Sequence, residues 1–379
     1  MPMLPLLAIN AIAMMAAAAG LAIFSLWPPQ AVAHVAFALG ILPLILAAMT
    51  YFIPVLTRSG SGAPRWLQAA PLTAWLGGIA LILGLTGTLN LIAASHVAFT
   101  LAGAATLAML IWSRQRGRRT VGKPHPGLHW YLAALAYLAI ALLAVPLMSL
   151  WPMQRAALRL FHLHLNLLGF VGLTSLGTLQ VLLPTAAARP DPRVATRLTT
   201  DLKFAVAGTL LLAAGAAWLK PLAFIGAGLY LIAPLRMLRD WLRSHADLIV
   251  RPHGATASLA AACAGLIGLL LLGIAHGLGL LAGRDAISAF VLAFLLPLVS
   301  GAATQLLPVW LRPGPQREWH ATLRATLGWL AGVRALLMVL GGLALALGWL
   351  QGVWLAAGGM GLLLLAALRA LSLRDLKQR

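Results

Sequence analysis

Twelve long hydrophobic runs alternate with short polar segments along the chain. A helix needs about 20 apolar residues to cross a bilayer, and each run is close to that length or longer. The pattern therefore predicts an all-α polytopic membrane protein forming a single transmembrane domain, 1–379. The runs, numbered 1 to 12 in chain order, lie at approximately 4–27, 31–56, 69–92, 94–113, 128–150, 156–184, 201–219, 221–243, 255–281, 286–311, 320–348 and 351–372.

The charges between the runs predict an orientation. Of the 27 Lys and Arg residues, 22 follow even-numbered runs, which leaves only Arg155, Arg159, Lys220, Arg284 and Arg334 elsewhere. Cytoplasmic loops carry the excess of positive charge in membrane proteins. We therefore expect the N- and C-termini to be cytoplasmic, with twelve crossings of a bacterial inner membrane.

Runs 2, 6 and 10 resemble one another, because each ends in an aliphatic residue followed by proline and then a basic loop. Aligning Pro54, Pro184 and Pro308 gives offsets of 130 and 124 residues, close to a third of the 379-residue chain. On this alignment His34 coincides with His164. The chain is therefore predicted to consist of three pseudo-threefold-related four-helix units, at approximately 1–123, 124–252 and 253–379.

Composition agrees with a membrane protein and excludes several classes. The chain is 61% hydrophobic and 9% charged, and although its net charge is +20, the cations lie between apolar runs, so no nucleic-acid partner is expected. The single cysteine, Cys263, excludes a disulfide within the chain and a thiolate metal cluster. No carboxylate falls in the middle of a run, which disfavours proton pumps and ion-coupled transporters.

Five histidines are candidate metal ligands. By the parity of the runs they all lie toward the outer face: His34, His96, His162, His164 and His276. The other five histidines lie in or beside the predicted cytoplasmic loops, where a solvated role is expected. Two imidazoles from facing helices are a common way to hold haem iron. We expect haem b between His34 and either His164, the first choice, or His162.

The pair His162 and His164 has a further implication. Residues two apart on a helix point to nearly opposite sides, so one helix could serve two sites. His276 or His96 would then join the remaining histidine around a second haem or a copper ion. Glycines beside these positions either allow close helix packing or leave room for a flat macrocycle.

Three arginines are candidate cofactor-binding residues. Arg155 and Arg159 precede His162, where a guanidinium could pair with haem propionates, or where both are simply outer-loop cations. Arg334 follows His320 by 14 residues, which corresponds to about 20 Å of helix. A buried arginine in a membrane needs a partner, and a cofactor carboxylate or helix-end carbonyls are both candidates.

Twelve helices in three four-helix units, with outer-side histidines on helices 2 and 6, resemble the haem-copper oxidase subunit I superfamily. In that superfamily, haem is held by histidines on helices 2 and 10 and copper by helices 6 and 7. This chain departs from the pattern: run 10 has no histidine, run 7 lacks a His-His pair, and run 6 lacks His-Pro-Glu followed by tyrosine. The departures argue against an oxygen-reducing centre.

The chain is also similar to the NnrS family, haem- and copper-containing membrane proteins linked to nitric oxide. Those relatives have twelve helices and a histidine-rich start to helix 2 that ends in proline and a basic loop, as from His34 through Pro54 to Arg58. The resemblance implies electron transfer with a respiratory partner, or nitrogen-oxide metabolism or response. The alternatives are a cofactor-free transporter and a copper or haem delivery factor for a respiratory oxidase.

Overall fold

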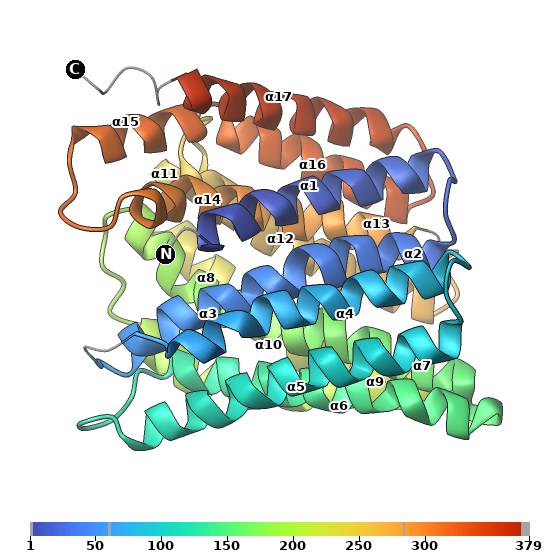
Figure 1. Ribbon diagram of the computed structural model, residues 1–379. Coiled ribbons are helices and arrows are strands. Elements are labelled where there is room, and N and C mark those ends of the chain that lie inside the picture. Colours follow the sequence, from blue (N-terminus) through green and yellow to red (C-terminus); the bar gives the residue numbers. More distant parts are fainter. Residues whose placement is uncertain (1–2, 60–61, 283–284, 373–379) are drawn as a thin grey trace. The chain divides into compact units, whose positions relative to one another are not determined.

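The computed structural model describes residues 3–59, 62–282 and 285–372, and all regular elements of this part of the chain are helices (Figure 1). Twelve of its helices are long and apolar enough to cross a membrane, which confirms the expected all-α polytopic architecture. Arg284 and the end of the basic C-terminal tail lie outside the described residues. Spans 1 to 12 run over Met3–Ile23, Pro29–Leu56, Arg65–Leu85, Leu91–Arg118, Gly127–Leu150, Pro152–Ala186, Val194–Ala217, Lys220–Ser244, Ala255–Gly277, Ala286–Leu311, Glu318–Ala346 and Gly352–Ser372.

Eight of these spans are single α-helices. They are α1 (Met3–Ile23), α5 (Leu91–Arg118), α6 (Gly127–Leu150), α9 (Val194–Ala217), α10 (Lys220–Ser244), α12 (Ala255–Gly277), α17 (Gly352–Ser372) and, after the 3₁₀ turn η2 (Arg65–Ala69), α4 (Ala70–Leu85). A short helix, α11 (Ala246–Ile249), lies between α10 and α12. The remaining four spans are interrupted.

Spans 2, 6 and 10 each contain a π-helical segment. Span 2 consists of α2 (Pro29–His34), η1 (Val35–Ile41) and α3 (Leu42–Leu56). Span 6 consists of η3 (Pro152–Gln154), α7 (Arg155–His164), η4 (Leu165–Gly172) and α8 (Leu173–Ala186). Span 10 consists of α13 (Ala286–Phe290), η5 (Val291–Leu295) and α14 (Leu296–Leu311). In the alignment of the three prolines, η1 and η4 start at equivalent residues and η5 falls within the same window.

Proline explains two of the three π segments. Pro43 and Pro297 are the second residues of α3 and α14, directly after η1 and η5. A proline has no N–H to donate to the preceding turn, so the carbonyls there must find donors farther along the chain. Span 6 has no proline at the equivalent position, but Gly169 and Gly172 lie within η4.

Spans 2 and 6 also end in the same way. Arg58 and Ala188, which are 130 residues apart, both adopt a left-handed conformation, with φ of 49° and 50°. In each case the next residue returns a backbone hydrogen bond to the proline of the last turn, from Ser59 to Pro54 and from Arg189 to Pro184. This is the helix-ending arrangement in which the left-handed residue is usually glycine.

Contacts divide the chain into two compact units. The histidine unit comprises Ala17–Gln180 and Pro192–Ala233, and the arginine unit comprises Met1–Ala16, Val181–Asp191 and Pro234–Arg379. The predicted three units concern equivalence between sequence segments rather than contacts, and that equivalence stays a prediction.

Aromatic side chains fill the core of the histidine unit. Trp130 on α6 is fully buried and donates from Nε1 to the carbonyl oxygen of Leu198 on α9, at 2.8 Å. Glycines of span 6 face these rings: an added Cβ at Gly177 would lie 2.7 Å from Trp130, and one at Gly169 would lie 2.8 Å from Tyr137. These two glycines therefore provide close packing, the first of the two roles expected for them, rather than space for a macrocycle.

The arginine unit is packed around α12, α14, α15 (Glu318–Leu327) and α16 (Ala331–Ala346). Gly265 on α12 lies against the backbone of Ala293, and Gly342 on α16 lies against the same residue.

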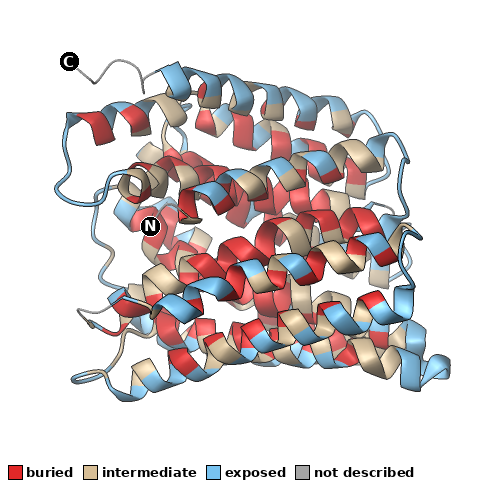
Figure 2. Ribbon diagram, viewed as in Figure 1, coloured by how far each residue is buried: buried red, intermediate tan, exposed pale blue. Residues whose placement is uncertain are grey.

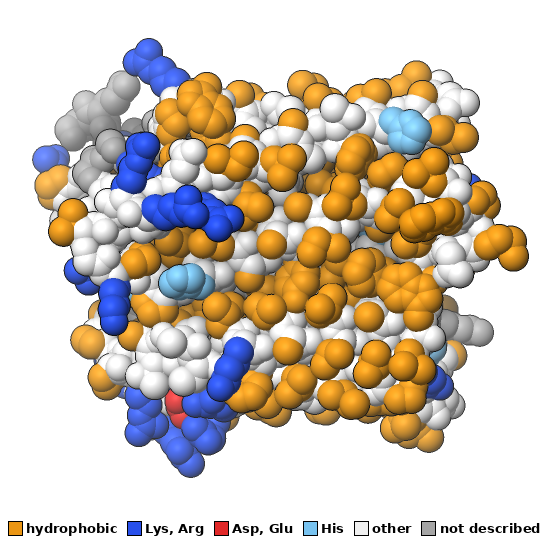
Figure 3. Space-filling view, turned by 90° about the horizontal axis from the view of Figure 1, so that it is seen from below, with side chains coloured by type: hydrophobic (Ala, Val, Ile, Leu, Met, Phe, Trp, Pro, Cys, Tyr) orange, Lys and Arg blue, Asp and Glu red, His pale blue; other side chains and the backbone are white. Residues whose placement is uncertain are grey.

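The surface of the chain differs from its buried positions. The helices turn their buried residues toward neighbouring helices (Figure 2). The face shown in Figure 3 is mostly hydrophobic, with Lys and Arg gathered mainly toward one end. Such a surface suits contact with lipid.

Span 11 is interrupted between α15 and α16. The break covers Gly328, Trp329 and Leu330, and Leu330 adopts a left-handed conformation with φ of 50°. The loop after α11 stabilises the break, because His253 Nδ1 accepts from the Leu330 N–H at 3.0 Å and Pro252 O accepts from the Gly332 N–H at 3.0 Å. The depth expected for Arg334 assumed a continuous helix from His320, and the break removes that assumption.

Candidate histidine site

The histidine unit brings two of the candidate ligands together. His34 is the last residue of α2, and His162 lies near the end of α7. Their imidazole rings have centroids 6.5 Å apart and planes inclined by 28°. The two rings come from different spans, so they meet only because the chain folds. Of the two partners expected for His34, His162 is the one in ring contact.

Backbone carbonyls orient both rings. His34 donates from Nδ1 to the Gln30 carbonyl oxygen at 2.7 Å, and His162 donates from Nδ1 to the Ala141 carbonyl oxygen on α6 at 2.8 Å. A carbonyl oxygen only accepts, so Nδ1 must carry the hydrogen in each ring. The neutral ring then presents the lone pair of Nε2. Histidines that bind metals commonly use this arrangement, with one nitrogen held by the protein and the other on the metal.

The spacing of the rings fits a single metal ion between them. A metal about 2.0–2.1 Å from each Nε2, in a linear arrangement, would put the ring centroids about 6.4 Å apart. Two rings in ordinary aromatic contact can lie at the same separation, about 4.5–7 Å. The spacing is thus compatible with ligation of one metal by both rings, and the bonds from Nδ1 leave Nε2 of each ring for such a metal.

His164 has the same local geometry as His34 but not the same neighbour. Its Nδ1 donates to the Leu160 carbonyl oxygen four residues back, at 2.8 Å, just as His34 does to Gln30. Both residues directly precede a π segment. Among the described residues, however, His164 has no ring contact with His34. His162 and His164 therefore lie in different surroundings, as expected for residues two apart on a helix.

The structure does not bring the other candidates into this pair. His96 on α5 is exposed, and His276, in the arginine unit, is exposed and donates from Nδ1 to the Leu281 carbonyl oxygen at 2.9 Å. Arg155 and Arg159 are exposed on α7, and Arg155 Nε lies 3.4 Å from the Met148 carbonyl oxygen. Within the described ranges, no group of three or more His, Cys, Asp or Glu side chains is placed to hold a metal.

Arg334 is buried in the arginine unit. Its side chain is 2% exposed, and Nη2 donates to the carbonyl oxygen of Leu327, the last residue of α15, at 2.7 Å. A helix-end carbonyl was one of the two kinds of partner expected for this arginine, and it is present. Nε and Nη1 are buried without a hydrogen-bond partner.

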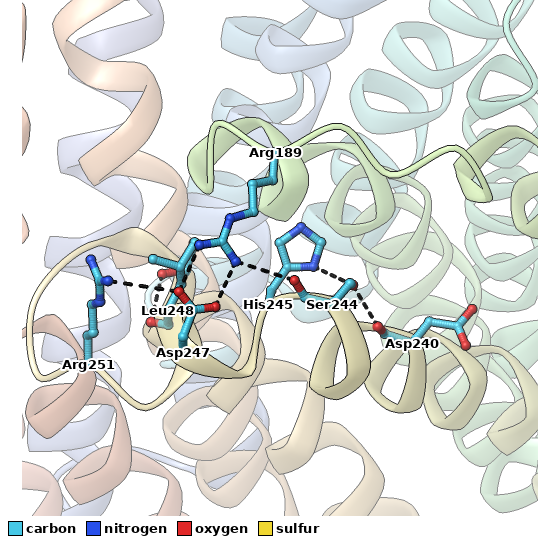
Figure 4. Close-up of polar contacts among 8 residues, drawn as sticks. Arg189, Asp240, Ser244, His245, Asp247, Leu248 and Arg251 are labelled. Atoms are coloured by element: carbon cyan, nitrogen blue, oxygen red, sulfur yellow. Dashed lines mark hydrogen bonds and ion pairs between the residues drawn. The ribbon is translucent and has the colours of Figure 1, made fainter.

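A polar cluster joins the loop after span 6 to the end of span 8, within the arginine unit (Figure 4). Arg189 forms a two-pronged ion pair with Asp247, at 2.7 and 2.8 Å, and Arg251 lies 3.8 Å from the same carboxylate. The hydrogen bonds from Arg189 hold the pKa of the Asp247 carboxyl below its ordinary value. Both side chains of the main pair are about half exposed, so this cluster orders a loop rather than forming a buried site.

Several features of these sites could not be predicted from the sequence. The Ala141 carbonyl is a backbone group, and the residue type does not indicate which backbone carbonyl will accept a hydrogen bond from a histidine. The π segments had a signal in Pro43 and Pro297, each in the middle of a hydrophobic run. The break in span 11 had only a weak signal in Gly328 and Gly332, because the left-handed residue itself is a leucine.

Comparison of the chain with protein-family models, with curated proteins and with solved structures found no match.

Proposed function

We propose that this chain is a haem-binding membrane protein in which His34 and His162 would hold the iron. The observation that carries the proposal is the pair of imidazoles from separate spans, 6.5 Å apart, each with Nδ1 bonded to a carbonyl oxygen. This geometry leaves one nitrogen of each ring for a metal. Arg155 and Arg159, exposed on the helix that carries His162, are proposed to pair with haem propionates.

The donor set favours electron transfer over oxygen reduction. A haem supplies one-electron redox chemistry when bound. His34 and His162 would hold the group through two protein nitrogens, and a haem held in this way would serve electron transfer with a respiratory partner rather than the binding of oxygen. Together with the resemblance to NnrS-like proteins, this supports a role in electron transfer or in nitrogen-oxide metabolism and response.

We further propose a subunit I-like arrangement of three four-helix units with both termini in the cytoplasm of a bacterial cell. The π segments support the threefold repeat, because they fall at matching positions of spans 2, 6 and 10 in the alignment of the three prolines. The shared ends of spans 2 and 6 support it for the first two units. The excess of Lys and Arg after even-numbered spans supports the orientation.

One observation favours a transporter as the second candidate function. Span 11 is interrupted beside a buried arginine, and interrupted helices with buried charges are found at substrate sites in transporters. Uptake by proteoliposomes that is unaffected by substitution of His34 and His162 would support this alternative.

An absorption spectrum tests the main proposal. Protein purified from haem-replete cells is expected to show a Soret band that shifts on reduction with dithionite, and metal analysis is expected to give iron. Colourless protein without iron would overturn the proposal. Copper without iron would instead support a copper-binding or delivery role for the same histidines.

A further inference from the structure

The interruption of span 11 adjoins a buried cation. Arg334 is 2% exposed, and among the described residues no carboxylate forms an ion pair with it. Its side chain donates to the Leu327 carbonyl oxygen from Nη2, while Nε and Nη1 are buried with no acceptor in this part of the chain. A buried guanidinium is a donor at all five N–H positions and costs free energy for each that is left unpaired.

The position of Arg334 in its helix adds to the unfavourable electrostatic energy of its charge. Arg334 lies in the first turn of α16, at the end of the helix where the backbone dipole is positive and cations are disfavoured. Its side chain reaches back across the break to the Leu327 carbonyl, at the negative end of α15. One carbonyl offsets only part of the unfavourable charge.

Other polar groups converge on the same place. Thr304 on α14, 3% exposed, donates to the Ser300 carbonyl oxygen at 2.9 Å, and its hydroxyl oxygen also lies 3.4 Å from the Leu327 carbonyl oxygen that accepts from Arg334. The backbone N–H groups of Leu330 and Gly332 are already bonded to His253 and Pro252. The buried side-chain atoms of Arg334 that lack a partner among the described residues, Nε and Nη1, are both donors.

We propose that the break in span 11 binds an oxyanion, a carboxylate or a phosphate group, through Arg334, with Thr304 at the side of the site. An oxyanion supplies both the negative charge and the acceptors that the orphaned Nε and Nη1 require, and guanidinium matches carboxylate and phosphate geometry. The same chemistry is offered by a free anion and by the headgroup of an anionic lipid. The site lies in the arginine unit and does not depend on the histidine pair.

The test uses the full chain in nanodiscs of phosphatidylcholine and follows the apparent Tm. A ligand that binds the folded state raises Tm in a saturable way. We expect sodium phosphate or sodium acetate, titrated at constant ionic strength with sodium chloride, to raise Tm if the ligand is a free anion. We expect the rise only on adding phosphatidylglycerol to the nanodiscs if the ligand is a lipid headgroup.

Two variants locate the effect. Arg334→Met is expected to abolish the Tm shift. Arg324→Met is the matched control, because Arg324 belongs to the neighbouring helix α15 and its side chain bonds to the Gln305 carbonyl oxygen and to Gln316 Oε1, so its variant should keep the shift. If Arg334→Met does not fold, the wild-type titration still decides. No shift with phosphate, acetate or phosphatidylglycerol, or an equal shift in Arg334→Met, would overturn the proposal. Since the readout involves no iron, failure of the haem proposal would not affect it.

Discussion

His34 and His162 lie on different spans with their ring centroids 6.5 Å apart and their planes inclined by 28°, whereas in the described part of the chain His164, two residues after His162, has no ring contact with His34. Of the two partners that the sequence left open for His34, His162 is the one in ring contact, and on this ground we select it as the proposed partner. The Ala141 carbonyl oxygen accepts from Nδ1 of the His162 ring.

The first prediction follows from this selection. His34→Ala and His162→Ala should each remove the Soret band attributed to the pair, because each deletes one axial nitrogen. His164→Ala should keep it, and His96→Ala, at an exposed position, serves as the control. Spectra of the four purified variants, normalised to protein, provide the measurement. Loss of the band in His164→Ala with retention in His162→Ala would show that His164 is the partner instead.

The second prediction concerns the close approach of α9 and α10. An added Cβ at Gly226 would lie 2.2 Å from the backbone nitrogen of Leu212 and 2.7 Å from the carbonyl oxygen of Gly208. Backbone atoms cannot move aside as a flexible side chain can, so Gly226→Ala should cost about 1–3 kcal/mol of stability. Gly228 on the same helix has no atom within 4 Å of its Cβ position.

Thermal unfolding in detergent, followed by tryptophan fluorescence, should therefore give a lower apparent Tm for Gly226→Ala and an unchanged or slightly higher one for Gly228→Ala. Equal Tm values for the two variants would contradict the packing of these helices.

A third prediction uses the left-handed residue after span 6. Ala188 is exposed and has φ of 50°, a conformation that costs an L-residue about 1–2 kcal/mol. Ala188→Gly removes this cost without removing buried surface, so the apparent Tm should rise. Ala187→Gly, one residue earlier and outside the left-handed region, should lower it through added flexibility of the unfolded chain. A fall in Tm for Ala188→Gly would argue against the helix ending described for span 6.

The fourth prediction concerns pH. The hydrogen bonds from Arg189 lower the pKa of Asp247, so the folded protein keeps this carboxyl ionised at pH values where the unfolded chain begins to bind a proton. The contribution to stability is therefore fully present above the ordinary value of 3.8 and is lost as pH falls through the lower folded-state pKa.

Asp247→Asn should accordingly lower the apparent Tm slightly at pH 6, and the difference from the wild type should vanish at acidic pH. Asp191→Asn is a comparison variant at another carboxylate of the same unit. A difference between Asp247→Asn and the wild type that is independent of pH would exclude the ion pair as its source.

The sequence was sufficient for the number and position of the spans, because apolar length is a property of each segment alone. All twelve runs correspond to helices in the structure, with ends displaced by a few residues. The sequence could not predict which of His162 and His164 contacts His34, because the contact depends on how α7 is rotated against α2 and α6. The rotation involves contacts between residues far apart in the chain, such as the hydrogen bond from His162 Nδ1 to the Ala141 carbonyl oxygen.

The interruptions show the same division. Pro43 and Pro297 predict an irregular helix, but the packing of the adjacent helices decides whether the irregularity is a kink or a π segment. At Leu330 nothing in the residue type predicts a left-handed backbone. The contacts from Pro252 and His253 impose it, from a loop nearly eighty residues earlier.

The π segments have a consequence for how spans 2, 6 and 10 could tolerate changes in length. A π-turn makes about the same rotation as an α-turn with one residue more, so a deletion that returns η1 to α-helix would leave His34 in phase with the proline-bearing end of span 2. The same deletion in the α-helical part, α3, would leave the span long and apolar enough for the bilayer. It would nevertheless turn His34 by about 100° relative to that end, and so disconnect the imidazole from α7 without touching a ligand.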